Sequence, residues 1–574
     1  MNPGERATTP VLARVVVGFI LASSVGAALS VAPLGAQMDQ MDHGAHGMEM
    51  SGGWRMPPMN MEMPMLPGLE GVVPVVRPML PGEKMDLASL PEAVPSRVVS
   101  MADGDTLDIS VSMVRRTLAG QTLAMFGYNG QYPGPLIQAP RDATLTIRVT
   151  NDIQMPTTVH WHGIRLDNAY DGVPGVTQDP IGPGGSFTYQ VRVPDAGMFW
   201  YHPHMREDVQ QDLGLFGNLL VTSPDPDHYG PMHREEILVL DDLLLDDQGL
   251  LPYGEESPTH ALMGRFGNVL LVNGGTDGRL DVRRGEVVRF YLTNVANTRT
   301  FNLRIEGARM KVVASDVSRY EREQWVESVV IAPAERYIVD VRFPESGRLS
   351  MVNAIQAVDH VRGVFEPRTD TLMRITVAEE EAAPDLGDAF ETLRHHPEVE
   401  EEVAHYRDWV DREPDHRLET TVRIRDLPLP IVQMMEMDTL YVPPLEWNDG
   451  MPMMNWLSTG EQVEWILRDP DTGAENGEID WRFQVGDVVK VRVHNPARSF
   501  HPMQHPFHIH GQRFVVLAMD GVTNPNMVWK DTAIIPVGST VDLVVEMSNP
   551  GTWMAHCHIA EHLHTGMMFG FTVE

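Results

Sequence analysis

Paired cysteines are missing from this chain, because Cys557 is the only cysteine among 574 residues. One cysteine cannot form an internal disulfide, so stability depends on packing, and the thiol stays free to bind a metal or to lie buried as a small apolar side chain. Basic charge is also scarce, since the formal net charge is -35. This excess of acid argues against binding to nucleic acid, whose phosphates need a basic surface. Solubility is the simplest reason for most of the charge, although an acidic surface also attracts cations.

Long apolar runs are equally scarce. The stretch from Val15 to Val31 is the long one, and it follows Arg6 and Arg14 and precedes Ala32-Pro33-Leu34-Gly35-Ala36. This order is typical of a secretory signal peptide over residues 1–36. Because no basic stop-transfer residues follow the run, we expect removal of the peptide and no stable membrane span afterwards. The sequence therefore predicts a periplasmic or secreted protein.

Strand-like alternation, broken by Gly, Pro, Asn and Asp, dominates the chain beyond about residue 95 and is typical of β-sandwiches and barrels. One unit occurs three times within it. An alternating segment ends at Asn151, at Asn294 and at Asn495, and each time a turn residue stands nine positions earlier. The repeat predicts an all-β protein in which three units share one frame. Each unit closes at a glycine, namely Gly197, Gly347 and Gly551.

Histidines distinguish the three copies of this unit. The first and third copies carry His-x-His doublets at matching places, whereas the middle copy has no histidine there. A repeat that keeps its frame and loses only these side chains predicts that metal ions lie between the first and third copies. The doublets are His160 and His162, His202 and His204, His508 and His510, and His556 and His558.

The only cysteine stands between two of these histidines. Residues i and i+2 of a strand share a face, so His556 and His558 should point to one side and Cys557 to the other. One short segment can therefore serve two metal sites. Thiolate, two imidazoles and a thioether form the blue-copper pattern, and Cys557, His562 and Met567 supply three of these donors locally, with His505 as the candidate for the fourth. An inert buried cysteine is the alternative, but the recurring doublets argue against it.

An acidic stretch separates the second and third units. Between Glu379 and Asp415, fourteen acidic residues stand against three arginines, which is typical of an exposed linker. The spacing of Val399, Val403 and Tyr406 predicts a short amphipathic helix that bridges two domains. The histidines of this stretch are expected to be solvated: His395, His396, His405 and His416.

The histidine motifs resemble the four copper motifs of three-domain multicopper oxidases, the laccase and copper-tolerance oxidase group. The resemblance spans roughly residues 95–574 and rests on His160-Trp161-His162-Gly163, Trp200-Tyr201-His202-Pro203-His204, His505-Pro506-Phe507-His508-Ile509-His510-Gly511 and the terminal His-Cys-His segment. It implies three cupredoxin-like Greek-key β-sandwich domains, at 96–225, at 230–378 without copper ligands, and at 419–574 with a type 1 copper. Residues 37–95 would form a Met-, Pro- and Gly-rich segment, and 379–418 an acidic linker with a short helix.

The same resemblance implies four copper ions. Type 1 copper would take His505, Cys557, His562 and axial Met567, type 2 copper would take His160 and His508, and the type 3 pair would take His162, His202, His204, His510, His556 and His558. Asp171 matches the family's acidic residue near the trinuclear cluster, thought to aid proton delivery, although an Asp-Gly turn is the plain alternative. Leu563 replaces a glutamate that serves proton supply in many bacterial relatives. Glu561 either tunes His562 or faces solvent.

The implied reaction couples one-electron oxidation of small donors at the type 1 copper to four-electron reduction of dioxygen to water. Phenols and aromatic amines are the first donors expected, and Cu(I) or Fe(II), as in copper tolerance, come close behind. Nine methionines between Met38 and Met65, and a second cluster that begins at Met434, either collect Cu(I) through soft thioethers or fill gaps in a core. A copper-sequestering protein, a blue-copper electron carrier and a copper nitrite reductase are the alternatives, but none of them requires all eight doublet histidines.

Overall fold

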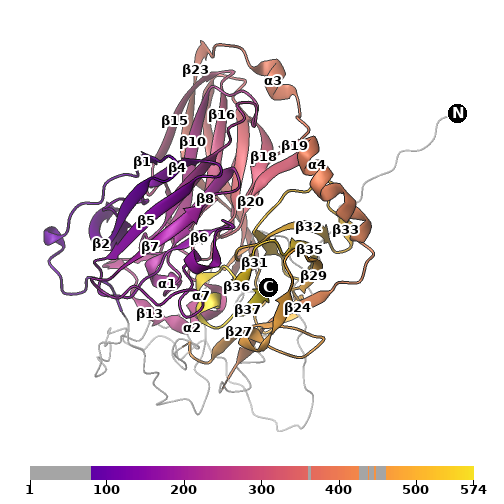
Figure 1. Ribbon diagram of the computed structural model, residues 1–574. Coiled ribbons are helices and arrows are strands. Elements are labelled where there is room, and N and C mark those ends of the chain that lie inside the picture. The colour runs from indigo at the N-terminus through magenta and orange to yellow at the C-terminus, as the bar shows by residue number, and fades with distance from the viewer. Residues whose placement is uncertain (1–78, 360–363, 426–436, 439–444, 448–459) are drawn as a thin grey trace, which may run out of the picture.

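The computed structural model describes residues 79–359, 364–425, 437–438, 445–447 and 460–574. The predicted signal peptide at 1–36 lies outside the described residues, and so do the methionines from Met38 to Met65 and the side chains of the second methionine cluster. Within the described ranges, no helix is long and apolar enough to cross a membrane. The described chain forms three β-sandwiches that pack against one another, coloured from indigo through magenta to yellow (Figure 1). The predicted all-β class is confirmed.

The first sandwich pairs a five-stranded sheet, in the order β1-β4-β9-β8-β6, with a four-stranded sheet in the order β3-β2-β5-β7. Apolar side chains alternate along β5, where Leu145, Ile147 and Val149 are fully buried between the sheets. The strands are β1 (Val98–Ser100), β2 (Thr106–Leu118), β3 (Gln121–Tyr128), β4 (Leu136–Pro140), β5 (Thr144–Asn151), β6 (His160–His162), β7 (Ser186–Arg192), β8 (Gly197–His202) and β9 (Gly217–Thr222). The short helix α1 (Glu207–Gln210) follows β8, and 3-10 helices span Leu87–Ser89 and Asn168–Tyr170.

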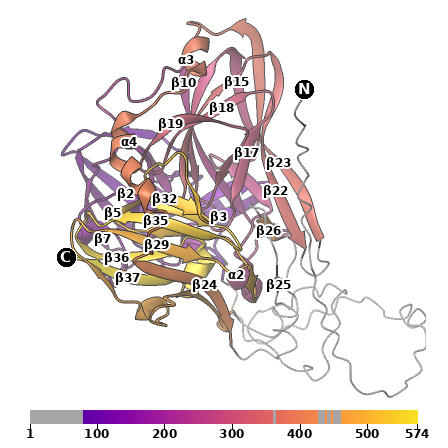
Figure 2. The same cartoon turned by 90° about the vertical axis from the view of Figure 1, so that its right-hand side faces the viewer.

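The second sandwich pairs sheets in the orders β14-β10-β16-β21-β18-β19 and β15-β23-β22-β17-β20. Its long hairpin of β22 and β23 extends toward the third sandwich (Figure 2), where β26 (Leu445–Trp447) pairs with β22 in parallel. The elements are β10 (Arg234–Leu243), β11 (Leu245–Asp246), β12 (Gly249–Leu250), β13 (Tyr253–Glu256), α2 (Ser257–Met263), β14 (Val269–Val272), β15 (Gly278–Arg284), β16 (Val287–Asn294), β17 (Phe301–Ile305), β18 (Arg309–Ser315), β19 (Ser318–Val326), β20 (Val329–Ile331), β21 (Arg336–Arg342), β22 (Gly347–Asp359) and β23 (Val364–Glu381).

The third sandwich repeats the arrangement with sheets in the orders β27-β24-β29-β35-β32-β33 and β28-β37-β36-β31-β34. Its elements are β24 (His416–Ile424), β25 (Met437–Asp438), β27 (Val463–Arg468), a 3-10 helix (Asn476–Glu478), β28 (Trp481–Phe483), β29 (Val488–His494), β30 (Arg498–Ser499), β31 (His505–Ile509), β32 (Arg513–Met519), β33 (Val522–Thr523), β34 (Thr532–Ile535), β35 (Thr540–Glu546), β36 (Gly551–Cys557), α7 (Ala560–His564) and β37 (Met568–Val573). Cys557 and His556 therefore lie on β36, and the adjacent strand β31 carries His505 and His508.

The repeated asparagines make equivalent hydrogen bonds in all three sandwiches. Asn151, Asn294 and Asn495 are buried at the ends of β5, β16 and β29. The amide of each donates to two backbone oxygens, one 4 to 8 residues later and one 30 to 40 residues later. Because buried polar groups need such partners, each asparagine fixes the loop that leads into the next strand. In the first copy this loop leads to β6, which bears His160 and His162, and in the third it leads toward β31, which bears His508 and ends one residue before His510.

The acidic segment contains α3 (Gly387–Glu391), α4 (Pro397–Val403) and a 3-10 helix (Ala404–Trp409). Val399, Val403 and Tyr406 are buried, as α4 contacts β19 of the second sandwich and the 3-10 helix contacts β32 of the third (Figure 1). The expectation of solvated histidines is wrong for His396. This ring is 2% exposed because it packs against β19, where its Nδ1 donates to the backbone oxygen of Tyr320 at 2.6 Å.

Candidate metal centres

Strand pairing brings the doublet histidines together. In the first sandwich β6 lies antiparallel to β8 with His160 opposite His202, and in the third β31 lies antiparallel to β36 with His508 opposite His556. The two pairs of strands face each other across the boundary between the sandwiches. Rings from the two sides interleave, with centroids 4.0 Å apart for His160 and His510. All eight doublet rings are buried, at 5% exposure or less.

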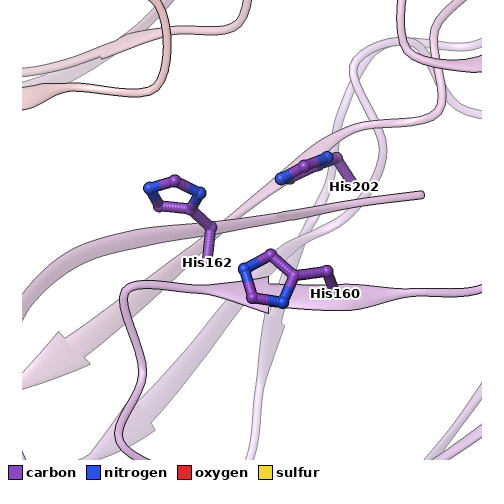
Figure 3. A group of neighbouring side chains, drawn as sticks. All are labelled: His160, His162 and His202. Atoms are coloured by element: carbon purple, nitrogen blue, oxygen red, sulfur yellow. The ribbon is translucent and has the colours of Figure 1, made fainter. Parts of the chain in front are cut away.

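Three rings of the first sandwich, those of His160, His162 and His202, lie beside one another (Figure 3). His160, His162 and His202 have ring nitrogens within 4.8 Å of one another, a spacing at which one ion can be held. The structure thus places the histidines of the first and third copies together, as the repeat predicts. Other described groups that meet this spacing around the same space are His160 with His508 and His510, His204 with His510 and His556, and His162 with His508 and Asp531.

One nitrogen of almost every ring is held by an oxygen that can only accept a hydrogen bond, so that nitrogen carries the proton. Backbone oxygens accept from Nδ1 of His160, His202, His508 and His556 at 2.8–2.9 Å. Carboxylates accept from Nδ1 of His510 and His204 and from Nε2 of His162 at 2.9–3.0 Å. The other nitrogen of each of these rings is left with a bare lone pair.

These lone pairs point inward without partners. In the part of the chain that the structure describes, no hydrogen-bond partner reaches Nδ1 of His162 or Nε2 of His160, His202, His204, His508 and His558. Nε2 of His510 and Nε2 of His556 face each other at 3.0 Å although the Nδ1 atom of each ring is already a donor. Burial lowers the pKa of His510 and His556 well below the ordinary value, so protonation does not relieve this contact. Neutral imidazoles with converging lone pairs fit copper ions, which take nitrogen ligands readily.

Asp171 contacts two of the rings. This carboxylate is 1% exposed, its Oδ2 accepts from His510 at 2.9 Å, and its Oδ1 lies 3.2 Å from Nδ1 of His160. Gly172 follows it with φ of 82°, and a Cβ there would meet the backbone oxygen of Val159 at 2.0 Å. Asp171 thus sits at a tight turn that requires glycine and also lies against the rings. The turn brings its carboxylate to the site.

Two further carboxylates at the site have no counterpart among the predicted residues. Asp531 accepts from Nε2 of His162 at 3.0 Å and binds Arg336 of the second sandwich through both oxygens, at 2.7 and 2.5 Å. Arg336 also donates to the backbone oxygen of Met198 in the first sandwich at 3.0 Å. All three sandwiches meet in this buried network. Glu207 is the other carboxylate, three residues after His204.

The only cysteine lies in a separate group of donors. Sγ of Cys557 is 3.5 Å from Nδ1 of His505 and 3.7 Å from Nδ1 of His562, and all three side chains are buried. Burial raises the pKa of the Cys557 thiol and lowers that of His505 to about 3. A neutral thiol becomes a thiolate here when a soft cation is bound, and this set fits copper. Met567 is buried nearby, and its backbone oxygen accepts from the N–H of Cys557 at 3.2 Å.

Glu561 is the remaining predicted site residue, and the structure shields it from solvent. Glu561 is buried, and its Oε2 accepts from Thr298 of the second sandwich at 3.0 Å, so the solvent-facing alternative is wrong. Burial, reinforced by the charges of Asp208 and Asp212, raises the pKa of Glu561 to about 8.

Trp465 stacks on His562, with centroids 4.1 Å apart and an interplanar angle of 28°.

Three β-sandwiches, with a cysteine-containing donor set in one of them and a histidine cluster between two of them, fit the class of copper oxidases. Family models described as multicopper oxidase match residues 110–226, 238–371 and 448–574, one in each sandwich. The chain belongs to the multicopper oxidase family and is a laccase-like oxidoreductase. The predicted family is confirmed.

Curated proteins and solved structures agree with this placement. The multicopper oxidase MmcO of Mycobacterium tuberculosis is 26% identical over 495 residues, covering 80% of this chain and 86% of its own. Laccase-1 of Botryotinia fuckeliana is 26% identical over 484 residues, covering 79% of each chain. A multicopper oxidase from Campylobacter jejuni, described as a metallo-oxidase, shares the fold with a TM-score of 0.63 and 23% identity, over 84% of this chain and 98% of that one.

Proposed function

We propose that this protein oxidises small donors by one electron at a time and reduces dioxygen to water by four electrons. The observation that carries the proposal is a cluster of eight buried imidazoles whose lone pairs converge, two of which, His556 and His558, flank the only cysteine in the sequence. A blue-copper carrier needs the cysteine group alone. The second group of donors is what an oxygen-reducing enzyme requires.

The proposal includes four copper ions. When bound, they supply the one-electron redox steps and the binding of dioxygen. Type 1 copper takes His505, Cys557, His562 and Met567, and type 2 copper takes His160 and His508. One type 3 ion takes His204, His510 and His556, whose ligand nitrogens lie within 4.8 Å of one another, and the other takes His162, His202 and His558.

Electrons have a short route between the two groups through the chain itself. His556 and His558 flank Cys557 in the sequence, so only the backbone separates the thiolate from two imidazoles. In addition, Nδ1 of His556 donates to the backbone oxygen of Cys557 at 2.8 Å. This hydrogen bond offers a second connection that bypasses part of the backbone. Proton supply falls to Asp171, whose Oδ1 lies beside the rings and has no hydrogen-bond partner in the described part of the chain.

Phenols and aromatic amines are the donors proposed first, and Cu(I) or Fe(II) is the second candidate. One observation favours the second candidate. His505 and His562 are 2% and 0% exposed, and Nε2 of His562 is 3.2 Å from the backbone oxygen of Leu262, so neither ring offers an open edge to a bulky donor. A small ion needs less room than a substituted ring.

Oxygen uptake by the copper-loaded protein tests the proposal. A methoxyphenol, Fe(II) and Cu(I) serve in turn as the only donor in one buffer, with correction for uncatalysed oxidation. Uptake with any of them, at four electrons for each dioxygen consumed, supports the oxidase function. Dominant phenol turnover supports the laccase-like label, and dominant metal-ion turnover supports the metallo-oxidase. Full copper loading without uptake from any donor contradicts the oxidase proposal and favours copper sequestration.

A further inference from the structure

We propose that Glu207 is a positioning residue of the histidine cluster, whose carboxylate holds His204 in the tautomer that presents Nε2 to copper. The proposal rests on the proposed oxidase function and adds a residue to it. Oε1 of Glu207 lies 2.9 Å from Nδ1 of His204, and the two side chains are 10% and 3% exposed. Nε2 of His204 has no hydrogen-bond partner in the described part of the chain. A carboxylate at this distance fixes both the proton and the orientation of the ring.

The local backbone explains why Glu207 reaches His204. The strand β8 ends at His202, and Arg206 takes a left-handed conformation, with φ of 47° and ψ of 56°, directly before α1 starts at Glu207. The next acidic residue is occupied elsewhere, because Asp208 accepts from Nε and Nη2 of Arg206 at 2.8 Å each. Two adjacent carboxylates therefore have separate partners. Of these two carboxylates, Glu207 is the one that contacts the ring of His204.

His204 differs from the neighbouring rings in the source of its acceptor. His160, His202, His508 and His556 donate from Nδ1 to backbone oxygens, which the fold supplies whatever the side chains are. The acceptor described for His204 is a side chain. A single substitution at Glu207 can therefore remove it and free the tautomer of His204. The remaining side-chain acceptors, Asp171 and Asp531, each contact more than one group of the site.

Loss of this contact should weaken the copper site that contains His204. Substitution of an outer carboxylate partner lowers metal affinity or activity by about 10- to 100-fold. The effect should be confined to the histidine cluster, because in the described part of the chain no hydrogen bond or ion pair joins Glu207 to Cys557, His505 or His562. A purely structural role predicts loss of folded protein without a selective loss of one class of copper.

The test compares Glu207→Leu, Glu207→Gln and Asp208→Asn with the unsubstituted copper-loaded protein. Each sample is dialysed against rising concentrations of a copper chelator, and three quantities are followed: bound copper, the near-ultraviolet band of the coupled type 3 pair, and the blue band. Glu207→Leu should lose the type 3 band at chelator concentrations at least about tenfold lower, with the blue band unchanged. Glu207→Gln keeps an acceptor oxygen and loses only the charge, so its shift should be smaller. Asp208→Asn should match the unsubstituted protein.

Release curves of the two Glu207 variants that superimpose on those of the unsubstituted protein would overturn the proposal. If Glu207→Leu does not fold, the Gln variant decides, since it has nearly the same shape and should still show a shifted type 3 release. Failure of the oxidase function looks different. In that case the unsubstituted protein itself shows no type 3 band when fully loaded.

Discussion

The two candidate metal centres are assembled in different ways. The cysteine group comes from one sandwich, with Cys557 and His505 on adjacent strands and His562 on the helix α7 that follows. The histidine cluster joins two sandwiches and depends on a third through Arg336. A site built within one unit is specified by a short stretch of chain. A site built between units also requires the buried contacts that dock them, and these are spread over the whole sequence.

Cys557→Ser should cause the largest loss of oxidase activity. It should disable the cysteine group and leave the histidine cluster intact. A serine hydroxyl is a poor ligand for copper compared with a thiolate, so the blue colour should disappear and donor oxidation should fall to the background rate. The histidine cluster should keep its copper, because none of its rings is changed. Absorption, copper content and oxygen uptake check this. A variant that remains blue would refute the type 1 assignment.

His160→Ala should separate the two metal centres by disabling the histidine cluster and leaving the cysteine group intact. The ring is shared by two of the described three-residue groups, so its loss should abolish oxygen reduction. The blue band should persist, since His160 does not contact the cysteine group, and the type 1 copper should still accept one electron from a donor under anaerobic conditions. Unimpaired water formation would contradict the type 2 assignment.

Asp531→Asn should show that the cluster depends on docking. It removes the bidentate partner of the buried Arg336, which keeps a longer ion pair with Asp316 at 3.4 Å. Breaking a buried pair costs about 3–5 kcal/mol when the remaining charge has no partner, so the free energy of unfolding should fall by up to about this amount. The type 3 band should weaken as well, because Nε2 of His162 loses its carboxylate acceptor. The matched control is Asp108→Asn, whose exposed pair with Arg148 at 2.7 Å should be worth less than about 1 kcal/mol. Equal changes from denaturant unfolding would contradict this account.

A pH dependence should arise outside both centres, at Asp212. Burial raises the pKa of this carboxyl to about 6 in the folded protein. Because the pKa is raised in the folded state, Asp212 contributes its full stabilisation at pH values below about 4, the pKa of the carboxyl in the unfolded chain. This stabilisation, roughly 3 kcal/mol in the free energy of unfolding, is lost as the pH rises through about 6. Asp212→Asn should remove this part, so the stability difference between the two proteins should change with pH in that range. A constant difference would show that the pKa is not raised.

Trp465→Phe should have the smallest effect and act on the cysteine group alone. The indole stacks on His562, and its Nε1 donates to the backbone oxygen of Ala261 at 2.8 Å, which fixes the ring. A smaller ring without this donor should shift the blue band and the reduction potential while changing turnover by less than about tenfold. The type 3 band should not move. Trp481→Phe is the control, as Trp481 packs on Phe569 in the same sandwich.

The sequence predicted the part of the site that depends on local pattern. Alternation, the repeated asparagines and the His-x-His spacing are all short-range features, and they located the strands and the histidines. Asp531 could not be predicted from the sequence, because it is 369 positions away from His162 and contacts it only after the domains dock. Glu207 was closer to prediction, since a glutamate three residues after a histidine can contact it at the start of a helix.

The burial of individual side chains was harder to predict than their identity. Glu561 and His396 both lie in polar surroundings in the sequence, yet each is buried against the second sandwich. Their partners, Thr298 and Tyr320, are more than 70 residues away. Such contacts follow from how domains pack, and neither composition nor periodicity contains that information.

Copper content combined with electron paramagnetic resonance of the fully loaded protein is the most direct test of two centres of different construction. Four copper ions for each chain are expected, with two giving signals, one of type 1 and one of type 2, and two silent because the type 3 pair is coupled. One copper for each chain with a type 1 signal alone would contradict the existence of the second centre.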